Sequence, residues 1–246
     1  MATGGIFLNG SSQYLEYSGR IVSGFPFSMA IWVTKSADQY QAWLSQSQLL
    51  ADRQVSMWQD VNGTSRYATV RNPGNGASAT KTTAPYAGAT LQLVVGVFTS
   101  TTSRTLYFGD NTGVTDTNSI TDDISNHDTV TIGAWHTNST APSLFMAGVV
   151  AEAHFFDAAL SSSDVTTLLT TAPDGGGIAS WVDGWKLASN SDLTSIGGTR
   201  TLTAVGSPST GSVTLPYTRT GGGSSIGAGL TSSPLLSGRL LRGLVR

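Results

Sequence analysis

Few residues of this chain are of the types that perform acid–base or metal chemistry, and their spacing limits what they can do. The three histidines are His127, His136 and His154, and no two of them stand at a metal-ligand spacing such as HxxxH. We expect His127 and His136 in loops, and His154 packed or hydrogen-bonded on a strand. The chain has no cysteine, which excludes disulfide bonds and cysteine metal sites.

The carboxylates are spaced poorly for catalysis. A glycosidase needs two carboxylates, one on either side of the sugar bond. The chain has only two glutamates, Glu16 and Glu152, and no strand with an E-x-D-x-x-E pattern. Pairs that include an aspartate stay open, but we expect no enzymatic activity and name no catalytic residue.

A polar stretch over residues 110–128 is rich in aspartate and asparagine and has no hydrophobic periodicity. Oxygen ligands of this kind can bind calcium, although their spacing does not fit an EF-hand. The candidate ligands are Asp110, Asn111, Asp116, Asp122, Asp123 and Asp128. Solvated loops have the same composition, so we expect no cofactor and no metal, with a structural calcium ion as the alternative.

Aromatic side chains could stack on the faces of sugars if they are exposed. The candidates are Trp43, Trp58, Tyr67, Tyr107 and Trp135. Trp58 and Trp135 are the two that we assign to glycan binding. The alternative is that all five pack within a β-sandwich.

The C-terminal end combines large apolar residues with arginines. Its residues Leu235, Leu236, Arg239, Leu240, Leu241, Arg242, Leu244, Val245 and Arg246 form the predicted partner-binding segment. Docking in a groove of another protein is the favoured interpretation. An anionic membrane, nucleic acid and the chain's own domain are the other surfaces that it could bind.

Composition indicates a β-sandwich with a basic tail. The chain has 246 residues, is rich in Gly, Ser and Thr, and has only 11% charged residues. The last acidic residue is Asp192, so residues 193–246 carry five arginines and no acid. No stretch resembles a signal peptide and none is long and apolar enough to span a bilayer, so we expect synthesis in a cytoplasm.

Short alternating segments predict strands along residues 1–205. Asn9-Gly10 predicts a hairpin between the first two strands, and Val61-Asn62-Gly63 predicts another. The expected strands lie at 5–8, 13–17, 25–34, 55–60, 64–70, 91–98, 104–109, 130–135, 178–187 and 199–205, with a strand or an irregular crossing at 42–50. From residue 206 onward the Gly/Ser/Thr/Pro-rich composition predicts a linker followed by an arm.

Residues 144–171 predict one long strand, a turn and a short helix. On the strand, Phe145, Ala147, Val149, Ala151, Ala153 and Phe155 alternate on one apolar face. The opposite face carries Glu152 and His154. Ser161 is the expected helix N-cap, Asp164 can complete a capping box, and Pro173 follows the helix.

The same stretch resembles laminin-G-like, concanavalin-A-like domains. The matching residues are Phe145, Gly148, Glu152, Phe155, Phe156, Asp157, Ala159, Leu160 and Ser161. Residues 27–33, 93–109, 132–133 and 181–187 resemble further motifs of the family in the same order. The resemblance implies an all-β, two-sheet antiparallel jelly-roll sandwich, here with one short helix near 161–171 and an extended C-terminal arm. Ala151 stands where the family often has an aspartate, which argues against a calcium site of the family type.

Together these features predict a jelly-roll domain over residues 1–205 and an anchoring arm over 206–246. We expect a non-enzymatic bacteriophage virion protein of the capsid-decoration or fibre type. Its partners would be capsid, portal or tail chains and further copies of itself, with a host surface glycan as a further ligand and neither nucleic acid nor membrane. The alternative function is a lectin-like carbohydrate-binding module.

Overall fold

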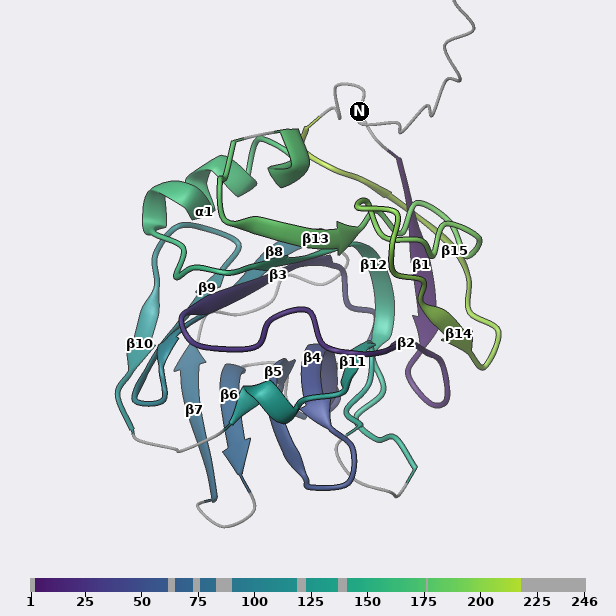
Figure 1. Ribbon diagram of the computed structural model, residues 1–246. Helices are drawn as coiled ribbons and strands as arrows, with labels where there is room; N and C mark the ends of the chain where they lie inside the picture. Colours follow the sequence, from purple (N-terminus) through teal and green to yellow (C-terminus); the bar gives the residue numbers. More distant parts are fainter. Residues whose placement is uncertain are drawn as a thin grey trace, which may run out of the picture.

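The protein folds into two antiparallel β-sheets packed face to face, as the computed structural model in Figure 1 shows. The structure describes residues 3–61, 65–72, 76–82, 90–118, 123–136, 141–175 and 177–217. The jelly-roll sandwich expected from the sequence is confirmed. Residues of the arm beyond Tyr217 lie outside the described part of the chain.

Eight strands form the first sheet, in the order β10-β9-β8-β3-β12-β1-β15, with β13 also paired to β12. Their bounds are β1 (Thr3–Asn9), β3 (Phe27–Val33), β8 (Gln92–Ser100), β9 (Ser103–Phe108), β10 (Val114–Asp116), β12 (Ala147–Phe156), β13 (Trp181–Trp185) and β15 (Ser209–Thr214). The strand β12 is central, because β3 pairs with one of its edges and β1 and β13 share the other.

Seven strands form the second sheet, in the order β14-β2-β11-β4-β5-β6-β7. Their bounds are β2 (Tyr14–Ser18), β4 (Gln41–Gln48), β5 (Arg53–Gln59), β6 (Arg66–Asn72), β7 (Gly76–Thr82), β11 (Thr129–Ile132) and β14 (Thr203–Val205). The uncertain segment at 42–50 is therefore a strand, and the predicted hairpin between β5 and β6 is confirmed by their antiparallel register.

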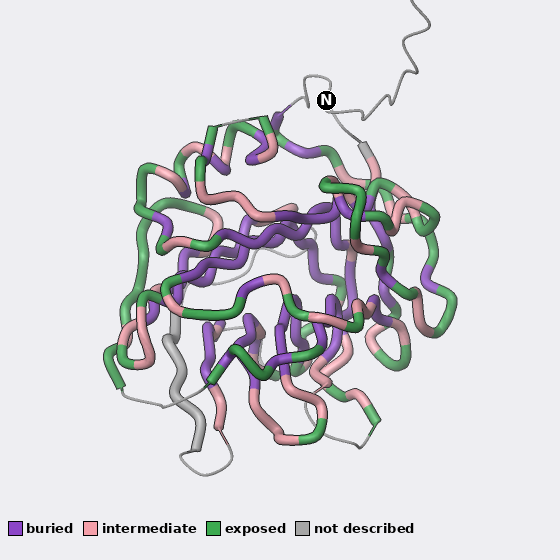
Figure 2. Tube along the Cα trace, viewed as in Figure 1, coloured by how far each residue is buried: buried purple, intermediate pink, exposed green. Residues whose placement is uncertain are grey.

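The main core lies between the two sheets, where Figure 2 shows the buried segments of both layers facing each other. Phe27 and Phe98 stack within it, with ring centroids 4.8 Å apart. A second apolar cluster lies on the outer face of the eight-stranded sheet, under the helix α1 (Ser162–Leu168). Within the described residues, no helix is long and apolar enough to cross a membrane.

The helix begins as the sequence predicts. Ser161 accepts a hydrogen bond from the Asp164 N–H, and the Asp164 carboxylate accepts one from the Ser161 N–H, which completes a capping box. Val165 and Leu168 are buried against the sheet. Two short 3₁₀ turns, η1 (Ile124–Asn126) and η2 (Pro173–Gly175), lie in loops.

The predicted hairpin at Asn9-Gly10 is wrong, because β1 and β2 belong to different sheets. The Asn9 carboxamide oxygen accepts hydrogen bonds from the N–H groups of Ser11, Ser12 and Gln13. This local turn carries the chain from one layer to the other. The apolar residues of β1 and β2 thus enter the core from opposite sides.

The single apolar face predicted for β12 is also wrong. The register with β3 shifts between Val150 and Glu152, which marks a β-bulge. Val150, Ala153 and Phe155 consequently face the main core, whereas Ala151 packs in the outer cluster. A bulge changes the face of the sheet to which the following side chains point. A strict alternation of faces along the sequence therefore assigns residues beyond the bulge to the wrong face.

The folded domain continues past the predicted boundary at residue 205. β15 pairs with β1, and the following residues Leu215 and Tyr217 are buried. Residues 206–217 are therefore part of the sandwich, although their Gly/Ser/Thr-rich composition indicated a linker. The strand is stabilised by pairing with β1, for which composition gives no signal.

Candidate functional site

A cluster of partly exposed aromatic side chains lies on the outer face of the seven-stranded sheet. Alternation along β5 and β6 places it there, because Val55, Met57, Ala68 and Val70 point into the core. Trp58, Tyr67, Thr69 and Arg71 then point outward. We call Tyr40, Trp58, Tyr67 and Trp135 the aromatic cluster.

The geometry of the cluster is set by cross-strand pairing. Trp58 and Tyr67 lie directly opposite each other, and their rings stack with centroids 4.1 Å apart. The Trp58 indole N–H donates to the Thr69 hydroxyl at 2.7 Å, which fixes the ring. Trp135 meets Trp58 edge-on at 6.0 Å, and Tyr40 lies tilted beside it at 6.3 Å.

Charged groups border the aromatic cluster. The Arg71 guanidinium lies 5.6 Å from the centre of the Trp135 ring, within cation–π range. It also forms an ion pair with Asp52, with 2.7 Å between Nη2 and Oδ2. Both charged side chains are partly exposed, so this edge offers hydrogen-bond donors and acceptors beside apolar rings.

The loop that carries Trp135 crosses the same face. The hydroxyls of Ser47 and Thr131 donate to the backbone carbonyls of His136 and Ala134, which holds the loop against the sheet. His136 Nδ1 lies 2.8 Å from Glu16 Oε2. Burial, and secondly the charge of Glu16, raise the pKa of the nearby Tyr14 hydroxyl above its ordinary value.

Three of the five aromatic candidates therefore come together, and two do not. Trp43 is fully buried in the main core, and Tyr107 is buried in the outer cluster of the other sheet. The register of β4 shifts between Ala42 and Leu44, so Trp43 and Leu44 both face the core. Tyr40, which is 49% exposed and stands directly before β4, was not among the candidates predicted from sequence.

The two glutamates lie on different sheets. Glu16 is on β2 of the seven-stranded sheet. Glu152 is on β12 of the eight-stranded sheet and is buried. They cannot flank one sugar bond. The Glu152 carboxylate accepts from the Tyr217 hydroxyl at 2.6 Å and lies 2.9 Å from His154 Nε2.

His154 belongs to this buried network, as expected of a hydrogen-bonded strand residue. The Trp181 indole N–H donates to His154 Nδ1 at 3.4 Å, which leaves Nε2 to donate its proton to Glu152. His127, expected in a loop, directly follows η1 and is buried.

The candidate calcium ligands are spread out. Asp116 pairs with the buried Arg104, Asp128 accepts from the Leu49 N–H, and Asp110 accepts from the Thr112 N–H. Asp123 caps η1, and hydrogen bonds from Ser125 lower the pKa of its carboxyl. Among the described residues, which do not include Asp122, no group of three acidic or histidine side chains could hold a metal ion.

No family model matches the sequence, and neither does any curated protein. Solved structures do match the fold. A putative carbohydrate-binding protein from Bacteroides ovatus has a TM-score of 0.62 at 11% identity, covering 89% of this chain and 62% of that one.

Two further structures are similar over about two thirds of this chain. A heptameric SAP-like pentraxin from Limulus polyphemus has a TM-score of 0.56 at 13% identity, covering 68% of this chain and 82% of its own. The CBM40 of a Ruminococcus gnavus IT-sialidase, bound to α2,3 sialyllactose, has a TM-score of 0.55 at 14% identity. The match covers 67% of this chain and 95% of that one. The chain thus has a two-sheet jelly-roll fold similar to that of these three structures.

Proposed function

We propose that this protein is a non-catalytic, lectin-like carbohydrate-binding module that holds a glycan on the aromatic cluster. The observation that carries the proposal is the partly exposed set Tyr40, Trp58, Tyr67 and Trp135 beside the Asp52–Arg71 ion pair. Aromatic rings bury the apolar C–H faces of a sugar, and a few polar groups then fix its orientation.

Two of the solved structures named above support this function, because they are named as carbohydrate-binding proteins. They favour the alternative function from the sequence analysis over the virion role, and none of the three is a virion protein. The segment from Leu235 to Arg246, on which the virion role depends, lies outside the described residues. Its attachment to another protein, a location in a virion and assembly into oligomers therefore stay predictions.

The test is a glycan array probed with the full chain and with the variants Trp58→Ala and Trp135→Ala. Loss of one stacking ring costs about 1 kcal/mol, so each variant should bind a positive glycan roughly fivefold more weakly. Phe7→Ala is the matched control, because Phe7 is a partly exposed aromatic residue on β1 of the other sheet.

Binding that survives both tryptophan substitutions, or that falls equally with Phe7→Ala, would remove the aromatic cluster as the site. An array with no positive glycan at millimolar protein would reject the proposed function itself. Circular dichroism of each variant must match the wild type, because Trp58 also donates a hydrogen bond to Thr69.

A further inference from the structure

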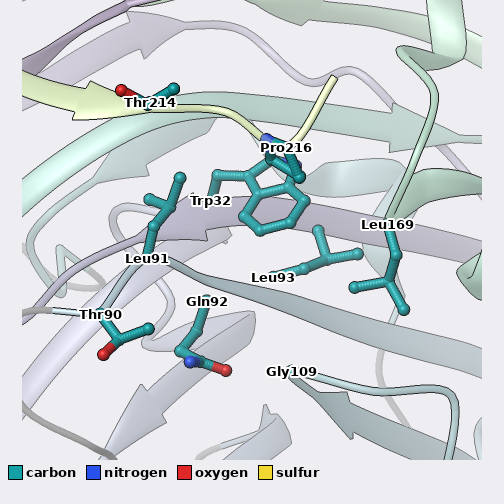
Figure 3. Close-up of a pocket in the computed structure, with 9 residues that line it drawn as sticks. All are labelled: Trp32, Thr90, Leu91, Gln92, Leu93, Gly109, Leu169, Thr214 and Pro216. Atoms are coloured by element: carbon teal, nitrogen blue, oxygen red, sulfur yellow. The ribbon is translucent and has the colours of Figure 1, made fainter. Parts of the chain in front are cut away.

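The outer face of the eight-stranded sheet contains a pocket of about 420 Å³. Figure 3 shows Trp32, Leu93 and Leu169 around it, with Pro216 closing the upper side. The rest of the lining is Thr90, Leu91, Gln92, Gly109 and Thr214, so polar groups border the apolar side chains. The pocket is on the opposite side of the sandwich from the aromatic cluster and lies outside the proposed glycan site.

The last described residues of the chain lie at the edge of this pocket. Thr214 and Pro216 line the pocket, and Tyr217 is the last described residue. The Tyr217 hydroxyl is held by buried Glu152, and its ring meets Trp32 edge-on at 6.2 Å. The start of the arm is therefore fixed beside the Trp32 wall.

The arm contains a segment whose side chains complement the pocket. Residues 235–246 (LLSGRLLRGLVR) contain five leucines and a valine. Burial of these side chains away from water lowers the free energy of the protein. Residues 218–246 carry four arginines and no acid, whereas residues 1–217 carry fifteen acids against nine bases. Asp110, an exposed acid, directly follows Gly109 in the pocket lining.

The distance to be covered is short for the tether. Residues 218–234 separate Tyr217 from Leu235, and a Gly/Ser-rich chain of that length spans about 20–25 Å on average. Such a tether gives the segment an effective concentration in the millimolar range at a pocket beside its origin. A second copy or another protein would have to exceed that concentration to compete.

We infer that residues 235–246 dock into the pocket of their own chain, with leucines against Trp32, Leu93 and Leu169. The arm then covers the apolar side of the pocket that lies beside Tyr217, the last described residue. This contact is independent of the glycan site, so either proposal can fail without the other.

Distances between two spin labels test the docking in the full chain, which has no native cysteine to interfere. One label is placed at Thr170→Cys, exposed next to Leu169, and the other at Ser237→Cys in the segment. A docked arm gives a narrow distance distribution that is shorter than the free-tether span. A pair at Leu50→Cys and Ser237→Cys is the control, because Leu50 is 82% exposed after β4 of the other sheet.

Two variants of the labelled chain each replace apolar side chains of the proposed contact by aspartate, one in the pocket and one in the arm. Leu169→Asp in the pocket and the double change Leu240→Asp with Leu241→Asp in the arm should both broaden the distribution, and Leu50→Asp should leave it unchanged. The arm variant changes no residue of the described sandwich, so it keeps the test valid if Leu169→Asp does not fold.

A broad distribution in the unmodified labelled chain would overturn the inference, as would a narrow one that neither variant changes. Dilution with a tenfold excess of unlabelled chain must leave the short distance intact. Loss of the short distance on dilution would place the segment in the pocket of a second copy instead and would also overturn it.

Discussion

At the scale of single residues, the Tyr217 hydroxyl is the most informative group in the fold. It bonds to Glu152, a carboxylate that is 1% exposed and shares its oxygen with His154. A buried carboxylate is stable only when hydrogen bonds replace its lost hydration. The end of the domain and the centre of β12 therefore stabilise each other.

Tyr217→Phe removes one hydroxyl and leaves the ring in place. Because the loss leaves a buried carboxyl oxygen with one hydrogen-bond donor fewer, we expect the free energy of unfolding to fall by about 1–3 kcal/mol. Urea denaturation at pH 7 measures this change. Tyr40→Phe is the control at an exposed tyrosine, and an equal effect of both substitutions would contradict the assigned role.

Tyr14 should make the protein sensitive to alkaline pH. The pKa of its hydroxyl is raised in the folded state, whereas in the unfolded chain this pKa is about 10. Above that pH the unfolded state loses the proton first, so stability falls as the pH rises through this range. Tyr14→Phe should lose less stability than the wild type between pH 9 and pH 11 in urea denaturation; parallel losses would speak against the raised pKa.

Residue type alone predicted part of the aromatic cluster. Trp58, Tyr67 and Trp135 are aromatic residues that the alternation of strands could expose, and the structure brings these three together. Trp43 was indistinguishable from them in sequence, but the bulge in β4 turns it into the core. Tyr40 belongs to the cluster through the path of a loop, which a local pattern does not encode.

At the scale of elements, β15 shows how long-range pairing determines what belongs to the domain. Its six residues, Ser209–Thr214, are small and mostly polar, and composition predicted a linker. Pairing with β1 gives them backbone hydrogen bonds, and the following Leu215 becomes buried. The capping box of α1, by contrast, needs only Ser161 and Asp164 three residues apart, so the sequence predicted it correctly.

Two truncations separate the domain from the arm. A chain that ends at Gly206 loses β15, Leu215 and Tyr217, and should lose on the order of 5 kcal/mol of stability. A chain that ends at Tyr217 keeps every described strand and loses only the docking of residues 235–246, so it should unfold much closer to the temperature of the full chain. Thermal unfolding followed by circular dichroism compares them, and similar melting of both shortened chains would place the boundary back at 205.

At the scale of the whole molecule, the sandwich offers two different outer faces. The seven-stranded sheet exposes the aromatic cluster, and the eight-stranded sheet is covered by α1 and by the last described residues, as Figure 1 shows for the helix. The overall fold was predictable because many short motifs agreed in order along the chain. The placement of the aromatic cluster and of the pocket on opposite faces was not, because it depends on which strands enter which sheet.

Separation of the two faces predicts that the arm does not affect glycan affinity. The chain that ends at Tyr217 should bind any glycan found on the array with the dissociation constant of the full chain, within about twofold. Isothermal titration calorimetry of both chains measures this. A large loss on removal of residues 218–246 would show that the arm takes part in the glycan site.

The antiparallel pairing of the terminal strands has a mechanical consequence. Thr3 lies opposite Thr214, so the beginning and the end of the described domain are neighbours at one corner of the sheet. A force that pulls these two ends apart acts across the ladder and opens its hydrogen bonds one after another rather than all at once. A domain tethered through both ends would therefore unfold at low force, beginning with the separation of β15 from β1. A force applied between one end and the aromatic cluster would instead act through the packed sandwich.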